Sequence, residues 1–240
     1  MRRILRPVIF AAASAIAVGV APTTASAATV VGQSFAPANG CAFATYLQTA
    51  VASGNSYTVP SPGVITSWTF QDASPIASDL RLKVGRLSGG SAVIVGESAA
   101  PTVRTVNQLN GPYPTRIPVL AGDIIGIYTS GVGNCSTFTG SASDTYLFVP
   151  GDQPLNTPYS GTADVNHKFP VTASVEPDAD NDGYGDETQD QCPSDPSHHG
   201  PCPTKSTPTG KRAAALAKCK NKHSARKRRK CRKKANLLPV

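Results

Sequence analysis

The sequence lacks an apolar run long enough to cross a bilayer as a helix. Its longest run, residues 8–20, has 13 residues, whereas a membrane-spanning helix needs about 20. The run follows three arginines and precedes a small-residue site at residues 25–27, which is the arrangement of a secretory signal peptide. An uncleaved anchor is the alternative, and the run is too short for it. We therefore expect residues 1–27 to be a leader and the mature protein to be secreted, extracellular and associated with the cell surface, without a transmembrane segment.

Acidic residues are absent from the C-terminal part of the chain, and basic residues are scarce before it. The part from Lys205 onward holds 14 of the 23 lysines and arginines and no acid. All 15 acids lie between residues 28 and 204, together with only six basic residues. The pI of about 9.3 therefore averages an acidic body and a strongly basic tail.

Helical periodicity is missing from residues 28–175, which are rich in Val, Ile, Thr, Tyr and Phe and are broken every 8 to 12 residues by Gly, Pro, Asn or Ser. This pattern is typical of an all-β domain. The expected strands are residues 63–71, 79–86, 91–97, 115–120, 123–129, 144–149 and 169–175. In the second of them Leu80, Leu82 and Val84 alternate with Arg81, Lys83 and Gly85, which predicts one buried and one wet face. About nine strands in all predict an antiparallel β-sandwich, jelly-roll-like.

Motifs of common enzymes are also missing. The sequence has no HExxH, no GxSxG and no Gly-rich phosphate loop. His167 is the one histidine of residues 28–175, too little for a predicted Ser/His/Asp triad. Seven acids of this part offer partners for a glycosidase pair only if the fold brings them together: Asp72, Asp79, Glu97, Asp123, Asp144, Asp152 and Asp164. We expect no catalytic residues; the alternative is a secreted hydrolase, of glycosides or esters, with its active site on the β-sandwich.

Residues 176–203 hold eight acids and almost no aliphatic side chains, so a hydrophobic core cannot fold them. Aspartates at positions one, three and five of a loop, a glycine at six and an aspartate at nine suit Ca²⁺, a hard cation that takes six to eight oxygens. Glycine permits the sharp bend, and the residue after it offers its carbonyl. The expected metal ligands are Asp178, Asp180, Asp182, Tyr184, Asp186 and Asp190. Position twelve, a bidentate Glu in an EF-hand, is Gln189, so the closing ligand is either Asp190 after a bulge or the amide oxygen of Gln189.

About 16 residues of this segment resemble the thrombospondin type 3 repeat, D-x-D-x-D-G-x-x-D-x-x-D-x-C-P. The matching residues are Asp178, Asp180, Asp182, Gly183, Asp186, Cys192 and Pro193, with Asp190 and Cys192 one residue late. The resemblance implies Ca²⁺ binding by these residues. The whole arrangement, from leader to basic tail, also resembles exported actinobacterial proteins.

Six cysteines in an exported chain predict disulfides. By position the expected local pairs are Cys41 with Cys135, Cys192 with Cys202, and Cys219 with Cys231. On one continuous helix the last two lie about 18 Å apart, beyond the roughly 7 Å limit for a bridge. Either they stay unpaired or the helix folds back at residues 221–224. A zinc site is the rival interpretation, but CxxC spacing is missing.

Residues 204–210 are expected to be a linker, and residues 211–240 a basic tail that forms a short helix or a helical hairpin. Its eight clustered cations are expected to bind a polyanion: Arg226, Lys227, Arg228, Arg229, Lys230, Arg232, Lys233 and Lys234. Envelope polymers such as teichoic acids or acidic polysaccharides, anionic lipids and the protein's own acidic segment are the candidate partners, and a solvated tail without a partner is the alternative. Nucleic acid is disfavoured because no aromatic residue lies among the cations.

Together these features predict a secreted, non-enzymatic calcium-binding protein of the cell envelope or extracellular matrix, in which the β domain serves as an adhesion module and binds a glycan or a protein. A shallow aromatic face, with Tyr113, Tyr128 or Tyr146 exposed, would suit such binding.

Overall fold

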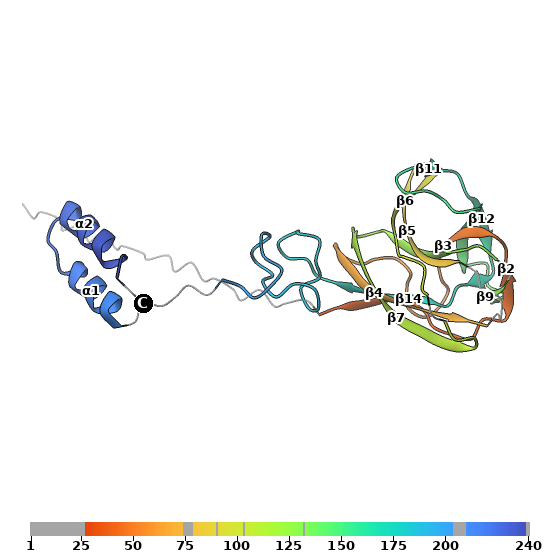
Figure 1. Cartoon of the computed structure of the whole chain (residues 1–240). Coiled ribbons are helices and arrows are strands. Elements are labelled where there is room, and N and C mark those ends of the chain that lie inside the picture. The colour runs from red at the N-terminus through yellow and green to blue at the C-terminus, as the bar shows by residue number, and fades with distance from the viewer. Residues whose placement is uncertain are drawn as a thin grey trace, which may run out of the picture.

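The computed structural model of the chain describes residues 27–73, 79–89, 91–102, 104–131, 133–203 and 210–238. The expected leader, apart from Ala27, and residues 204–209 of the expected linker lie outside the described residues. The chain is mostly β, with antiparallel sheets followed by two short helices near the C-terminus (Figure 1). Neither helix is long and apolar enough to cross a membrane.

The described chain has more strands than the roughly nine that the sequence predicts. They are β1 (Thr29–Gly32), β2 (Asn39–Cys41), β3 (Ala44–Ala50), β4 (Gly63–Asp72), β5 (Leu80–Ser88), β6 (Ser91–Glu97), β7 (Gln108–Val119), β8 (Ile124–Thr129), β9 (Gly133–Phe138), β10 (Thr145–Pro150), β11 (Pro158–Tyr159), β12 (Thr162–Val165), β13 (His167–Lys168) and β14 (Val171–Glu176). All seven individually expected strands are present; β6 has the expected bounds, and the bounds of the other six are shifted by at most seven residues. The additional ones are mostly short strands at the sheet edges.

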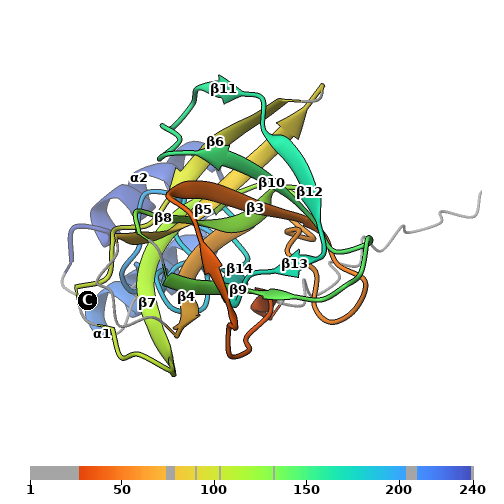
Figure 2. The ribbon, with the colours of Figure 1, turned by 90° about the vertical axis from the view of Figure 1, so that its right-hand side faces the viewer.

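The strands form three sheets. One has the order β1-β14-β4-β7, the second β11-β6-β5-β8-β3-β10-β12 and the third β13-β9-β2, and every pairing between named strands is antiparallel. In Figure 2 the strands of the seven-stranded sheet lie above β4 and β7 of the four-stranded sheet. The fully buried Trp68 and Phe70 of β4 share one apolar core with Ile125 and Ile127 of β8, so the two larger sheets are joined by side-chain packing.

Strand β3 was not among the expected strands, and it is buried on both faces. Five consecutive residues from Ala44 are buried, so the strand has no alternation of apolar and polar residues. Its one amide, Gln48, is fully buried and donates from Nε2 to the carbonyls of Ala50, Thr145 and His167 at 3.0–3.1 Å. Because a polar glutamine occupies a core position, the hydropathy pattern does not predict this strand.

The prediction that β5 has one face in water is wrong at Lys83. The side chain of Lys83 is fully buried, although the alternation places it toward solvent. Its Nζ contacts Glu97 Oε2 on β6, Asp152 Oδ1 at 2.5 Å and the carbonyl of Gln153 at 3.2 Å. The segment after β10 thus covers this face of β5, which makes the ammonium an internal charge.

The C-terminal helices are α1 (Gly210–Lys220) and α2 (Ala225–Ala235). The chain reverses at residues 221–224, as expected, and Ser224 caps α2 by accepting a hydrogen bond from the Lys227 N–H. Cys219 and Cys231 form a disulfide between the helices. The other two expected disulfides, Cys41–Cys135 and Cys192–Cys202, are also present.

Candidate functional site

Residues 177–203 contain no helix or strand and are held by turns, a disulfide and one buried carboxylate. That carboxylate is Glu176, the last residue of β14, which is only 2% exposed. Its Oε1 accepts from the hydroxyls of Thr66 and Thr188, and its Oε2 accepts from the N–H groups of Glu187 and Thr188, all at 2.7–3.0 Å. Burial alone raises the pKa of Glu176, but these hydrogen bonds outweigh it and hold the pKa below its usual value. Glu176 thus fixes the acidic segment to the end of the four-stranded sheet.

The loop itself is shaped by its own aspartates. Asp178 accepts from the N–H groups of Asp182 and Gly183, both at 3.0 Å, and Asp182 Oδ1 accepts from the Tyr184 N–H at 2.8 Å. Asn181 and Gly183 have φ angles of 61° and 84°, in the left-handed region where asparagine and glycine are best tolerated. These turns bend the chain so that alternate side chains face one centre.

Two overlapping groups of ligand atoms result. One carboxylate oxygen each from Asp178, Asp180 and Asp182 lie within 4.8 Å of one another. Atoms of Asp182, Asp190 and His199 form a second group of the same size. Because Asp182 belongs to both, the expected ligands Asp178, Asp180, Asp182 and Asp190 gather at one place.

Three oxygens of this cluster are buried without a hydrogen-bond partner among the described residues. They are both carboxylate oxygens of Asp180 and Oδ2 of Asp190, a residue that is 4% exposed. A buried carboxylate oxygen without a donor costs free energy that folding must offset. A cation at this centre would supply the missing partner, so the residues fit a metal of the class that prefers oxygen ligands.

The electrostatics of the cluster agree with its geometry. Burial raises the pKa of Asp180, and the charges of Asp182, Asp190 and Asp178 raise it further. Burial and three carboxylates of the cluster likewise raise the pKa of Asp186. Carboxylates that repel one another in this way bind cations more favourably than isolated ones.

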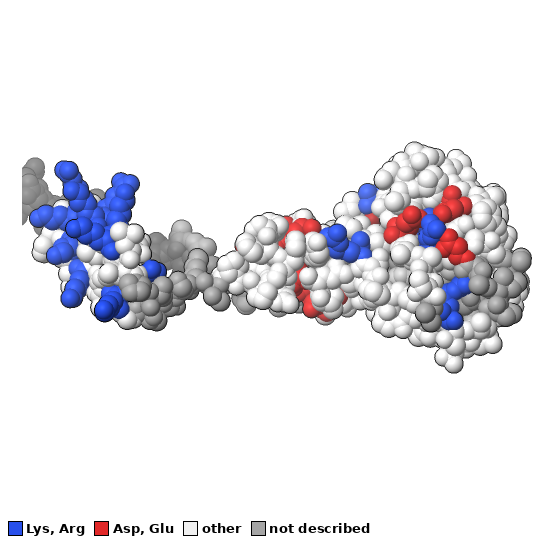
Figure 3. Space-filling view, in the orientation of Figure 1, with Lys and Arg blue, Asp and Glu red and all other residues white. Residues whose placement is uncertain are grey.

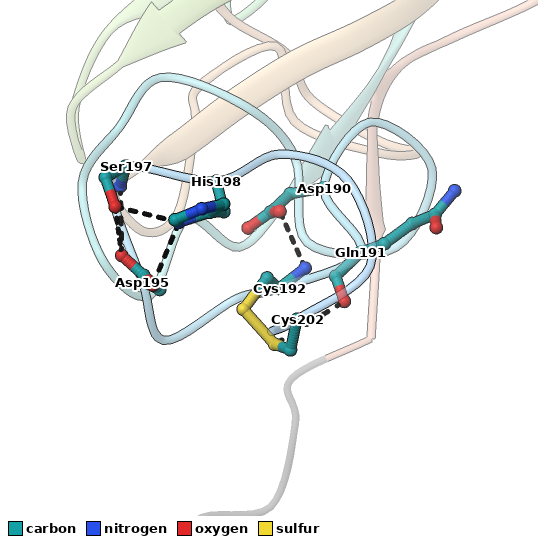
Figure 4. Close-up of a disulfide and its surroundings, with 7 residues drawn as sticks. All are labelled: Asp190, Gln191, Cys192, Asp195, Ser197, His198 and Cys202. Carbon is teal, nitrogen blue, oxygen red and sulfur yellow. Dashed lines mark hydrogen bonds and ion pairs between the residues drawn. A yellow bond between two sulfur atoms is a disulfide. The ribbon is translucent and has the colours of Figure 1, made fainter. Parts of the chain in front are cut away.

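The structure distinguishes between the two expected closing ligands. The amide nitrogen of Gln189 donates to the carbonyl of Thr115 at 2.7 Å, and its Oε1 lies 3.5 Å from the Gly185 nitrogen. Gln189 therefore joins the segment to β7. Asp190 uses Oδ1 to accept from the Cys192 N–H at 2.8 Å and leaves Oδ2 free (Figure 4). Asp190 is the better closing residue on this geometry.

Asp186 and Tyr184 lie at the border of the cluster. Asp186 Oδ1 accepts from the Ala179 N–H at 3.2 Å. The Tyr184 ring lies between the Arg116 guanidinium, 4.1 Å from the ring centroid, and the His199 ring, at 3.8 Å. The side chain of Tyr184 thus joins β7 to the turn closed by Cys192–Cys202, and only its carbonyl is available to a cation.

His199 was not among the residues that the sequence predicted for this site. Its Nδ1 lies 2.7 Å from Asp182 Oδ2, and its carbonyl accepts from the Gln191 N–H at 3.0 Å. The signal was the nearby disulfide, which brings residues just before Cys202 back onto the acidic loop. His198 does stay peripheral, bonded to Asp195 and Ser197 (Figure 4).

The seven acids of the β domain converge only in part. Asp79, Glu97 and Asp152 meet around Arg81 and Lys83, a patch of red around blue in Figure 3. Asp123 pairs with Arg86, Asp144 accepts from the Ala52 N–H and Asp164 from the Tyr146 hydroxyl; Asp72 has no described side chain. Each of these three carboxylates contacts at least one of the two cations. The cluster therefore suits a structural network.

The expected aromatic face is not exposed. Tyr128 and Tyr146 are 5% and 8% exposed, and Tyr113 packs partly buried against Trp68. Tyr146 instead lines a pocket of about 280 Å³ with Tyr46, Phe148 and Phe169. Asp164 and His167 also line it; the Val165 N–H and the Tyr146 hydroxyl lower the pKa of Asp164 by bonding its carboxylate.

The eight cations expected to bind a polyanion all lie on α2 and are exposed. Blue side chains cover this end of the chain in Figure 3. Within the described residues, none of the eight forms an ion pair.

Comparison of the chain with protein-family models, with curated proteins and with solved structures gives no match in any of the three.

Proposed function

We propose that the acidic segment binds Ca²⁺ and that the chain is a secreted, non-enzymatic calcium-binding protein of the cell envelope. The observation that carries the proposal is the set of buried, unpartnered oxygens on Asp180 and Asp190. Asp178, Asp182 and Asp186 would add further carboxylates, and Tyr184 its carbonyl. Bound Ca²⁺ would neutralise the mutual repulsion of these groups and hold the segment in one conformation.

Secretion is part of the proposal and is compatible with three disulfides, which persist in oxidising compartments. The two larger sheets would then be the halves of a jelly-roll-like sandwich. We place the glycan or protein ligand of that domain at the aromatic pocket beside Tyr146, because it combines ring surface with the Asp164 carboxylate. The alternative of a secreted hydrolase has less support, because the converging carboxylates are held by Lys83 and Arg81.

Titration of Ca²⁺ into the full-length oxidised protein tests the metal site. Calorimetry should give a Kd on the order of 10⁻⁴ to 10⁻³ M. At 10 mM Ca²⁺ the free energy of unfolding should rise by about 1.4 to 2.7 kcal/mol, from mass action at those affinities. Asp180→Asn should weaken binding by about 10-fold or more, because it removes a charge whose two oxygens have no other partner.

Asp195→Asn is the matched control, since Asp195 lies in the same segment but bonds only Ser197 and His198. It should bind Ca²⁺ as the wild type does. Absence of heat at millimolar Ca²⁺, or equal weakening by both substitutions, would contradict the proposal.

A further inference from the structure

The two C-terminal helices form a clasped unit with a fixed orientation. Cys219 on α1 and Ala235 on α2 are 0% and 3% exposed where the helices meet, and the Cys219–Cys231 disulfide joins them. The Arg212 guanidinium of α1 donates to the carbonyl of Leu238 at 2.7 Å. The outward faces of α2 are thereby set by covalent and hydrogen-bonded contacts, so its cations are arranged before any ligand arrives.

Three of the four arginines of α2 lie on one side of the helix. Arg228, Arg229 and Arg232 line a hollow of about 400 Å³ with Lys233 and Asn236. At 3.6 residues per turn these positions share one stripe, and Lys227, Lys230 and Lys234 share another. We call the stripe of Arg228, Arg229 and Arg232 the arginine face.

Among the described residues, no acidic side chain pairs with the arginine face. No acidic residue follows Asp195 in the sequence. Arg228 NH1 donates to the carbonyl of Lys222 at 3.1 Å, which orients this guanidinium without neutralising it. Three neighbouring guanidinium groups on one side of a helix are therefore left for an external anion.

The chemistry of the face suits an oxyanion in a polymer. A guanidinium presents a planar fork that binds two oxygens of a phosphate or a carboxylate at once, whereas an ammonium acts as a point charge. A bilayer is a poorer partner, because a helix that lies in a membrane surface needs large apolar residues on its other face, and α2 has only alanine and cysteine besides its cations. Single-stranded nucleic acid lacks a stacking platform, because α2 contains no aromatic residue.

We propose that the arginine face of α2 binds a base-free phosphodiester polymer, a polyol phosphate, through paired hydrogen bonds from Arg228, Arg229 and Arg232. The inference deepens the proposed envelope association by naming the ligand chemistry, and it does not depend on the Ca²⁺ site. Because Lys227, Lys230 and Lys234 lie on another stripe of α2, the two sets of cations can be substituted separately in a direct test.

The test measures binding of poly(glycerol phosphate) to the full-length oxidised protein in EDTA and 150 mM NaCl. The variant R228K/R229K/R232K keeps the net charge but lacks the three guanidinium groups. We expect its affinity for poly(glycerol phosphate) to be about 10-fold lower than that of the wild type. The control K227Q/K230Q/K234Q removes three charges from the other stripe. It should lose less than about 3-fold, since separated exposed charges are largely screened beyond roughly 8 Å at this ionic strength.

Equal binding by the wild type and the arginine-to-lysine variant would overturn the inference, because charge alone would then explain attachment. So would equal or tighter binding of polyglutamate, duplex DNA or phosphatidylglycerol vesicles by the wild type. All of these substitutions are at exposed positions, and circular dichroism should show unchanged helix content. Polymer binding is measured in EDTA, which removes Ca²⁺, so it is independent of the Ca²⁺ site. If the wild type binds Ca²⁺ as proposed but does not bind the polymer, this inference alone is rejected.

Discussion

Replacing Glu97 and Asp152 together by their amides is expected to lower the free energy of unfolding by about 3 to 5 kcal/mol, the typical cost of leaving one member of a buried ion pair uncompensated. Lys83 is the reason. Its side chain is fully buried, and both anions that contact Nζ would become neutral amides of nearly unchanged shape. Urea unfolding of the E97Q/D152N variant measures the loss.

The same two substitutions should cost less than about 1 kcal/mol in a K83M background, because no buried charge is then left without a partner. Asp79→Asn is the matched control in the same cluster, since Asp79 contacts only the partly exposed Arg81. It should cost less than about 1 kcal/mol. If E97Q/D152N is as mild as Asp79→Asn, the internal ammonium is not held by these carboxylates as described.

Glu176→Gln is expected to lower the free energy of unfolding by about 2 to 3 kcal/mol at pH 7, because hydrogen bonds to a charged acceptor are stronger than those to an amide. The four donors come from Thr66 on β4 and from Glu187 and Thr188 of the acidic segment. The effect should depend on pH. The folded-state pKa of Glu176 is lowered, so its contribution is fully present above the unfolded value of about 4.3 and disappears as the pH falls through the folded value.

Thermal or urea unfolding in EDTA, from pH 7 to pH 3, should therefore show the wild type and Glu176→Gln converging at the acid end. Glu187→Gln is the control, because Glu187 is exposed and its carboxylate accepts a single hydrogen bond among the described residues, from the Ala28 nitrogen. If the free energies of unfolding of the wild type and Glu176→Gln differ by the same amount at every pH in this range, the shape of the Glu176 side chain, and not its charge, stabilises the contact.

The sequence predicted strands with apolar alternation or an apolar run, and it missed what long-range packing decides. The alternating β5 and the fully buried, apolar β8 were both expected. Strand β3 was not, because its core position 48 is a glutamine whose partners lie 97 and 119 residues away. Lys83 was assigned to solvent for the same reason, since Asp152 covers it from a distant segment.

At the candidate site the local part of the geometry was predictable. The spacing of Asp178, Asp180 and Asp182 alone indicates that their oxygens converge, and they do. The position of Gln189 was not predictable, because its amide donates to the Thr115 carbonyl, 74 residues away. The position of His199 beside Asp182 depends on the loop closed by the Cys192–Cys202 disulfide. The sequence predicted this cysteine pair but not the course of the chain between the two cysteines.

The contact between the Ala28 nitrogen and Glu187 Oε1, at 2.6 Å, would connect the proposed cleavage of the leader to the acidic segment. In the precursor this nitrogen is a neutral amide. Cleavage after Ala27, where the leader is predicted to end, turns the same atom into an α-ammonium facing a carboxylate. Processing would thus add an ion pair, worth up to about 1 kcal/mol at such an exposed place, between the new first residue and the proposed Ca²⁺ segment. The precursor and the mature protein are then expected to differ in how firmly that segment is fastened, even though every other residue is the same.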